Sequence, residues 1–169
     1  MMQVTQIARD KERTVMNLLD GARMELLSPS NEDAYCVLRG TIPPGVSVPL
    51  HSHADAESFY VLSGDAEALV QVEGGLEWQM LRPGDFIHIS GGANHKHAWR
   101  NVSSEPMSAL IICTAKLGRA LQEMGQLTSE YGTQFPSQTA IQRLVEISTR
   151  YGYWLGSQEE NAAVGIQLP

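Results

Sequence analysis

Short apolar runs separated by turn-forming residues follow one another from residue 14 to residue 114. Within many of them apolar and polar positions alternate, as in a β-strand that is buried on one face. The predicted strands are 14–19, 22–27, 34–42, 59–62, 66–72, 76–81, 86–89, 95–100 and 107–114. Turn signals recur about every eight to twelve residues, and this spacing predicts an all-β sandwich or barrel.

Three turns are marked by their residue types. Asp20-Gly21 and Gly74-Gly75 each separate two apolar runs, and such dipeptides favour tight hairpins. Pro43-Pro44-Gly45 ends one strand and turns the chain towards the next. A polar loop of Ser, Pro and Asn is expected at 28–33.

Helix-period patterns begin only after residue 114. Residues 115–126 contain helix formers, and Gly125 is a plausible stop. A second helix is predicted from Ser137, as N-cap, to Gly152, as the residue that follows the last turn. The tail from 157 to 169 is loosely patterned, so we expect an arm or partial disorder. The expected organisation is an arm at 1–13, one barrel domain at 14–114 and a helical extension with a tail at 115–169.

Composition narrows the class of protein. The 169 residues carry a formal net charge of −7, which disfavours nucleic acid as a partner. No apolar run approaches the ~20 residues that a membrane span needs, and Met1–Arg13 lacks the apolar region of a signal peptide. Cys36 and Cys113 lie in apolar runs and are interpreted as two buried thiols. A cytoplasmic protein without membrane contact is therefore expected.

Histidine is concentrated in one part of the chain. The five histidines are His51, His53, His88, His95 and His97, and none lies in the first 50 or the last 72 residues. On a strand, His51 and His53 point to the same face, and Glu57 has the same parity. Two imidazoles and a carboxylate that converge in this way suit a first-row transition metal. His95 and His97 also share a face if their segment is a strand.

The stretch from Gly45 to Gly64 resembles the first cupin motif, G-x5-H-x-H-x3-E-x6-G. The match is made by Gly45, His51, His53, Glu57 and Gly64, without a gap. The span from about Asn17 to Tyr153 resembles single-domain cupins of the quercetin-dioxygenase-like group. This resemblance implies an all-β cupin jelly-roll barrel, or double-stranded β-helix, with short C-terminal helices.

The second cupin motif, G-D-x4-P-x-G-x2-H-x3-N, is matched less regularly. Gly84, Asp85, Gly92 and His95 fit it, but Ser90 replaces the proline, and Asn101 comes two residues late. Counting back from Asn101 selects His97 instead of His95. An insertion is tolerated better in the Gly91-Gly92 loop than within a paired strand, and this favours His97. Both histidines remain candidates for the third imidazole ligand, and the other one would line the cavity.

The resemblance implies one divalent transition metal per chain, held by His51, His53, Glu57 and either His97 or His95. Iron, manganese, nickel, copper and zinc all remain open, and Glu57 is the candidate catalytic residue. A metal-dependent dioxygenase acting on a small aromatic or flavonoid-like compound is the first expectation. The alternatives are a non-catalytic cupin that binds a small ligand and a metal-dependent isomerase or epimerase.

The surroundings of this site and the assembly of the chain are also predicted. Phe59, Phe86 and Trp99 are candidates for the pocket lining or for plain core, whereas Tyr60 has the opposite parity to Glu57 and is expected to face away. A homodimer is expected, because a β-sandwich has open edges and two-fold dimers are the commonest homo-oligomers.

Overall fold

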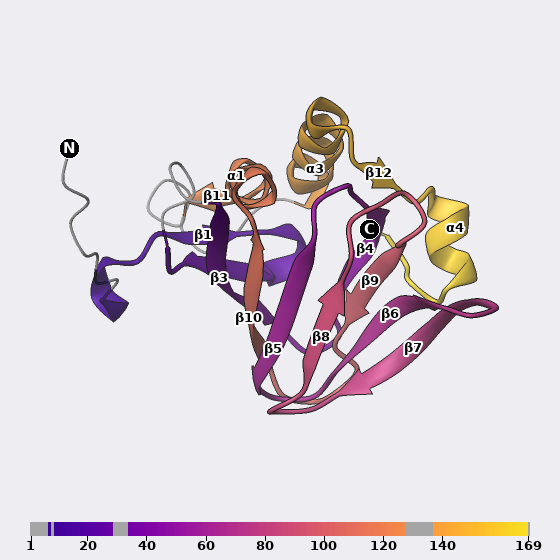
Figure 1. The fold of residues 1–169 in the computed structure, drawn as a ribbon, viewed down its shortest axis with the longest axis horizontal. Coiled ribbons are helices and arrows are strands. Elements are labelled where there is room, and N and C mark those ends of the chain that lie inside the picture. Colours follow the sequence, from indigo (N-terminus) through magenta and orange to yellow (C-terminus); the bar gives the residue numbers. More distant parts are fainter. Residues whose placement is uncertain (1–6, 8, 29–33, 128–136, 169) are drawn as a thin grey trace.

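The computed structural model describes residues 7, 9–28, 34–127 and 137–168, and within them the strands form two antiparallel sheets (Figure 1). The larger sheet has the order β11 (Gln126–Leu127), β1 (Val15–Asn17), β2 (Arg23–Leu26), β3 (Tyr35–Ile42), β10 (Met107–Thr114), β5 (Glu57–Ser63) and β8 (Phe86–Ile89). The smaller sheet has the order β12 (Trp154–Leu155), β4 (Ser47–Ser52), β9 (His97–Arg100), β6 (Ala66–Val72) and β7 (Gly75–Leu81). Ten of these strands lie between residues 15 and 114, so the predicted jelly-roll barrel is confirmed.

The hairpin between β1 and β2 turns at the predicted Asp-Gly pair. Asp20 has φ 56° and ψ 28°, and Gly21 has φ 85°. Two successive positive φ angles define a turn whose twist matches that of the flanking strands. The turn lies within a short 3-10 segment, Leu19–Gly21 (η2), and leads β1 and β2 into antiparallel register.

The core fills the space between the two sheets. Phe59 of the larger sheet packs on Trp99 of the smaller one, with ring centroids 4.6 Å apart. Both side chains also line the barrel cavity. Tyr60 faces away, as predicted, but the expectation that Phe86 lines the pocket or joins the core is wrong. Phe86 pairs with Tyr60 and is 59% exposed, because it shares the outward parity of its partner.

Two helices cover one end of the barrel. Helix α1 (Ala115–Met124) is capped by the Thr114 side chain, which accepts the backbone N–H of Leu117, and it ends at the predicted Gly125. Helix α3 (Ser137–Tyr151) ends before Gly152, whose φ of 74° fits the predicted role. Figure 1 shows both helices over the ends of β10 and β5. Residues 128–136, between the two helices, and most of the loop predicted at 28–33 lie outside the described residues.

The C-terminal tail differs from its prediction. Instead of an arm, it forms helix α4 (Gln158–Ala163), which begins with a capping box between Ser157 and Glu160. The side-chain oxygen of the fully buried Asn161 accepts a hydrogen bond from the backbone N–H of Leu50 over 2.8 Å. Ile166, which follows the helix, is buried in a hydrophobic cluster with Leu50 and Leu69. A six-residue helix shows too little periodicity to be recognised, and side-chain hydrogen bonds to the barrel hold it in place.

The outer face of the larger sheet is partly apolar. Exposed large hydrophobic side chains there are Tyr35, Tyr60, Leu62, Phe86 and Ile112. The homodimer stays a prediction, for which sedimentation velocity is the direct measurement. None of the described helices is both long enough and apolar enough to span a bilayer.

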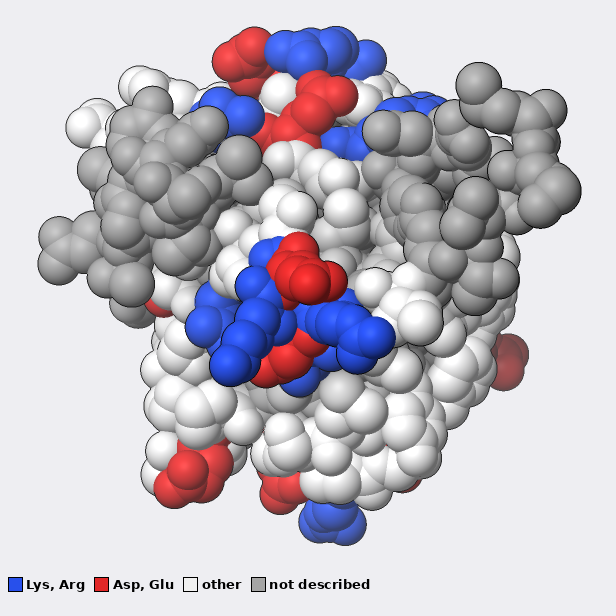
Figure 2. Space-filling view, turned by 90° about the vertical axis from the view of Figure 1, so that its left-hand side faces the viewer, with Lys and Arg blue, Asp and Glu red and all other residues white. Residues whose placement is uncertain are grey.

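A network of charged side chains lies on β2 and β3 and includes Arg13, which precedes β1. Glu25, which is 5% exposed, lies within 2.6 Å of Arg39, 3.4 Å of Arg13 and 3.5 Å of Arg23. Figure 2 shows a compact group of acidic and basic side chains on the side of the molecule that carries β1, β3 and η1 (Asp10–Glu12).

Candidate metal centre

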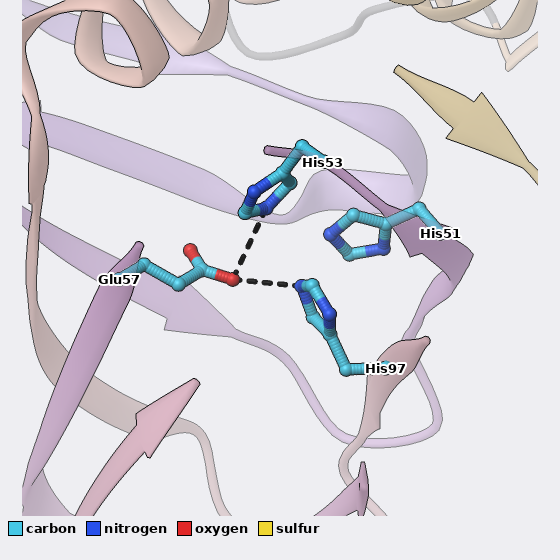
Figure 3. A group of neighbouring side chains, drawn as sticks. All are labelled: His51, His53, Glu57 and His97. Carbon is cyan, nitrogen blue, oxygen red and sulfur yellow. Dashed lines mark ion pairs between the residues drawn. The ribbon is translucent and has the colours of Figure 1, made fainter. Parts of the chain in front are cut away.

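Four side chains from three strands meet at the end of the barrel covered by α1 and α3. His51 lies near the end of β4, His53 follows that strand, His97 begins β9, and Glu57 begins β5 in the opposite sheet. Each offers one ligand atom, and these four atoms all lie within 4.8 Å of one another. Figure 3 shows the three imidazoles and the carboxylate pointing towards a common centre. The site therefore links the two sheets, and strand pairing sets its geometry, since His51 and His97 are direct cross-strand partners.

Each imidazole is oriented by a backbone carbonyl two residues away. Nδ1 of His51 lies 2.8 Å from the Pro49 oxygen, that of His53 2.7 Å from the Asp55 oxygen, and that of His97 2.8 Å from the His95 oxygen. A carbonyl oxygen only accepts hydrogen bonds, so Nδ1 must carry the hydrogen in all three rings. In the neutral imidazole the lone pair then lies on Nε2. Three such lone pairs and a carboxylate form a ligand set of the kind that zinc, iron and related cations prefer.

Glu57 is 5% exposed, and its Oε1 atom lies 2.7 Å from Nε2 of His97 and 3.4 Å from Nε2 of His53. Dashed lines mark both pairs in Figure 3. Oε1 and the His97 Nε2 atom are buried and make no geometrically acceptable hydrogen bond in the described structure. Buried polar atoms without a partner are costly. Two acceptors that face each other at this distance need a proton or a cation between them, so the four residues fit a metal.

The electrostatics of the metal-free cluster support this assignment. Burial lowers the pKa of His51 to about 3, helped by the neighbouring His97, so its imidazole is neutral. Burial also acts to lower the pKa of His53, but the adjacent Glu57 carboxylate outweighs this and raises the pKa. Burial acts to raise the pKa of Glu57, and the adjacent imidazoles of His53 and His97 reverse that effect and lower it. The metal-free centre therefore holds an ionised carboxylate that a proton on His53 neutralises.

The structure places His97, and not His95, with the other three residues. His95 precedes β9, and its ring nitrogen Nδ1 lies 2.6 Å from the Ser90 oxygen, so the side chain is tied to its own loop. The predicted strand at 95–100 is thus two residues too long, because the loop after Gly92 continues to Lys96. The remaining histidine, His88, is exposed and contacts Ser58.

A cavity of about 840 Å³, including its open mouth, lies between the cluster and the helices. His51, His53 and Glu57 form its polar wall, with Ser47, Ser148 and the Tyr153 ring nearby. The rest of the lining is aliphatic: Leu18, Leu19, Ala22, Val48, Pro49, Leu117, Leu121, Met124, Ala140, Leu144 and Leu155. A second lobe extends into the barrel towards Phe59, Trp99, Met107 and Ile111. Arg23 also lines this second lobe, and His51 and Glu57 border both lobes. No lysine or arginine lines the outer lobe as far as the described residues show.

Comparisons with known proteins agree with this architecture. Residues 38–113 match the cupin domain family. The polyketide cyclase RemF from Streptomyces resistomycificus aligns with a TM-score of 0.57 and 16% identity, over 66% of this chain and 80% of that one. A cupin-2 domain protein from Rhodospirillum rubrum aligns with a TM-score of 0.55 and 18% identity, over 68% and 78%. Likenesses at these identities show the fold alone. The barrel is a cupin double-stranded β-helix, and residues 38–113 are its cupin domain.

A curated relative is more similar in sequence. The dimethylsulfoniopropionate lyase DddQ from Ruegeria pomeroyi is 33% identical over 93 residues, which are 54% of this chain and 43% of the lyase. The chain therefore spans less than half the length of that relative. The proteins named here are a lyase, a cyclase and a cupin-2 domain protein, so the finer resemblance to quercetin-dioxygenase-like cupins stays a prediction.

Two features beside the site were not predicted from the sequence: the contact between Asp55 and Tyr153, and strand β12. Asp55 and Tyr153 form a hydrogen bond of 2.8 Å beside His53, although they are 98 residues apart in the chain. The available signal was the position of Asp55 between two predicted ligands. Strand β12, which pairs with β4 at His51 and Ser52, was also missed because it has only two residues.

Proposed function

We propose that this chain is a metal-dependent enzyme acting on a small, predominantly apolar organic molecule. Dioxygenase chemistry on an aromatic or flavonoid-like compound is the reaction to test first. One observation carries the proposal: three oriented Nε2 atoms and a buried carboxylate converge on the wall of a largely aliphatic cavity. A closed structural metal site would not need such a cavity beside it.

His51, His53, Glu57 and His97 would hold the metal. Four protein ligands leave open positions around a six-coordinate cation, and the bound metal would supply Lewis-acid or redox chemistry there. Glu57 also borders both lobes of the cavity. Its pKa is lowered, so the carboxylate stays ionised, and this favours metal binding and electrostatic stabilisation of positive charge over proton abstraction.

The cavity lining supports an apolar substrate. Its aliphatic wall excludes water, which strengthens the electrostatic interactions of the polar groups at its base. The absence of lysine and arginine from the described lining of the outer lobe disfavours substrates whose binding depends on a carboxylate or phosphate. An aromatic compound with one or two oxygen atoms that can bind the metal fits such a cavity, because its ring would pack on the apolar wall and its oxygen atoms would reach the polar centre.

Lyase chemistry is the second candidate, and the similarity to the dimethylsulfoniopropionate lyase favours it. That substrate carries a sulfonium cation and a carboxylate. The outer lobe offers the ionised Glu57 for the cation, but among the described residues a basic side chain that could bind the carboxylate, Arg23, lines only the second lobe. For this reason we rank it below the oxygenase.

The test begins with elemental analysis of protein purified without added metal. Protein loaded with iron, or with the metal so found, is then assayed for dioxygen uptake with a panel of catechols and flavonols. Consumption of dimethylsulfoniopropionate is followed in parallel by proton NMR. We expect about one metal per chain and oxygen uptake that is lost in Glu57→Gln. Metal binding with no turnover in any assay would favour a ligand-binding cupin, and turnover of a sugar or keto isomer pair would favour an isomerase.

A further inference from the structure

Asp55 lies in the turn between the two predicted ligands His53 and Glu57, and it is only 8% exposed although it is charged. Its backbone carbonyl accepts the Nδ1 hydrogen of His53 over 2.7 Å. The orientation of the His53 imidazole therefore depends on where the peptide group of Asp55 lies. Nothing in the metal centre itself fixes that peptide group.

Two hydroxyl groups from distant parts of the chain hold the Asp55 carboxylate. Thr114, at the end of β10, donates to Oδ1 over 2.6 Å, and Tyr153, after α3, donates to Oδ2 over 2.8 Å. Lys116 Nζ lies 3.7 Å from Oδ2. Burial acts to raise the pKa of Asp55, but these two hydrogen bonds outweigh it and lower the pKa. Bonds to an ionised acceptor are about twice as strong as bonds between neutral groups.

The same turn is held from the other side by the loop that follows β8. Gly92 donates its backbone N–H to the His53 oxygen over 2.8 Å. Gly91 packs so closely on the Ala54 carbonyl that any Cβ atom there would collide with it. Contacts with Gly91 and Gly92 on one side and the hydrogen bonds of the Asp55 carboxylate on the other therefore fix the position of the turn. In addition, the Tyr153 ring packs against the His53 ring, with centroids 5.3 Å apart.

We propose that Asp55 is a positioning residue of the metal centre, which Thr114 and Tyr153 hold in place so that it orients His53. Through Tyr153 the C-terminal segment takes part in metal binding without supplying a ligand. The inference rests on the proposed metal-dependent function, in which His53 is a ligand. Groups that orient a metal-bound imidazole typically contribute about 10–100-fold to metal affinity.

The chain offers a matched control for the test. Tyr151 also donates its hydroxyl to a carboxylate, that of Glu123 over 2.7 Å, and its ring packs against that of Tyr153, a contact that phenylalanine keeps. Tyr153→Phe and Tyr151→Phe therefore remove the same group from the same segment. We expect Tyr153→Phe to weaken Co²⁺ binding by about 10-fold and Asp55→Ala by up to about 100-fold. Tyr151→Phe should leave the affinity unchanged, and only the first two variants should alter the visible spectrum of bound Co²⁺.

A second measurement needs no metal. Long-range ¹H–¹⁵N NMR of the metal-free protein at alkaline pH reports which nitrogen of each imidazole carries the hydrogen. We expect His53 to be protonated on Nδ1 in the wild type and in Tyr151→Phe, and to populate both tautomers in Asp55→Ala and Tyr153→Phe. If the wild type binds no Co²⁺, the proposed function fails, and the NMR result still decides whether Asp55 positions His53. Wild-type affinity together with wild-type His53 signals in Tyr153→Phe would overturn the inference, and this conservative variant decides it even if Asp55→Ala does not fold.

Discussion

Two buried glutamates in the same barrel have different surroundings. Glu25 and Glu57 are each 5% exposed, and each lies beside basic side chains. The partners of Glu25 are three guanidinium groups, which stay charged at any pH the protein meets. The neighbours of Glu57 are imidazoles whose inward nitrogens carry lone pairs in the neutral form.

The difference teaches how one residue type serves either structure or chemistry. Arginine neutralises the charge of Glu25 permanently, so this carboxylate needs neither a bound proton nor a metal to balance it. Glu57 is neutralised only by a proton on a neighbouring imidazole, and a metal can replace that proton. The identity of the basic partners, and not the burial of the acid, marks the functional site.

The largest expected effect separates His97 from His95. His97→Gln should lower metal affinity by more than about 100-fold, because it removes a ligand and not merely a group that orients one. His95→Gln should retain metal, because its carbonyl still accepts the Nδ1 hydrogen of His97. Isothermal titration with Zn²⁺ measures both. Retained affinity in His97→Gln would break the assignment of the centre.

The second prediction compares the two glutamates directly in metal-free protein. Glu25→Gln should reduce the free energy of unfolding by about 2 kcal/mol, because it removes charge-assisted hydrogen bonds from a buried carboxylate. Glu57→Gln should change it by less than about 1 kcal/mol, because the imidazole of His53 can lose its proton once the carboxylate is gone, and no unpaired buried charge is then left. Urea unfolding followed by circular dichroism gives both values. The contrast between the regions is lost if Glu57→Gln proves the more destabilising.

A third prediction concerns metal affinity and pH. The pKa of His53 is raised, so its proton competes with the metal near neutral pH, whereas His51, with a pKa of about 3, does not compete. Metal affinity should therefore increase as the pH rises from about 6 to about 8. In the metal-free protein, a His53 pKa that is higher in the folded than in the unfolded chain stabilises the fold while His53 is protonated. This contribution is lost as the pH rises through the folded pKa, so the free energy of unfolding should fall slightly over the same range. Glu57→Gln should flatten the stability profile, since Glu57 causes the shift.

The smallest expected effect is the acid response of the Glu25 network. Burial acts to raise the pKa of Glu25, but the bonds from Arg39 and Arg13 outweigh it and lower the pKa. Because the pKa of Glu25 is lower in the folded than in the unfolded chain, its ionised carboxylate stabilises the fold at a pH above the unfolded pKa of about 4.3. This contribution is lost as the pH falls below that value. The wild type should therefore lose more stability between about pH 5 and 3 than Glu25→Gln does. Parallel urea titrations at several pH values would reveal equal losses if the network were unimportant.

The sequence predicted most of the barrel strands, the hairpins and the residues His51, His53 and Glu57, because turn residues and strand parity are local signals. It favoured His97 but kept His95 as a candidate, since both have the same parity and the choice depends on the path of a loop. The contact of Tyr153 with Asp55 could not be predicted, because only the tertiary fold brings residues 98 positions apart together. Helix α4 was missed since its stability comes from Asn161 bonding to the barrel, which no pattern in a six-residue segment reveals.

The division of labour along the chain has a consequence for how such a protein can diversify. The four candidate metal ligands lie within residues 51–97, whereas α1, α3 and β12, which cover the cavity, lie within residues 115–155. Recombination or directed evolution confined to residues 115–155 can thus change which molecules enter the cavity and leave the candidate metal ligands unchanged. A C-terminal segment taken from another protein would nevertheless have to keep two contacts with the barrel. One is a strand that pairs with β4 at His51, and the other is a tyrosine hydroxyl that reaches Asp55.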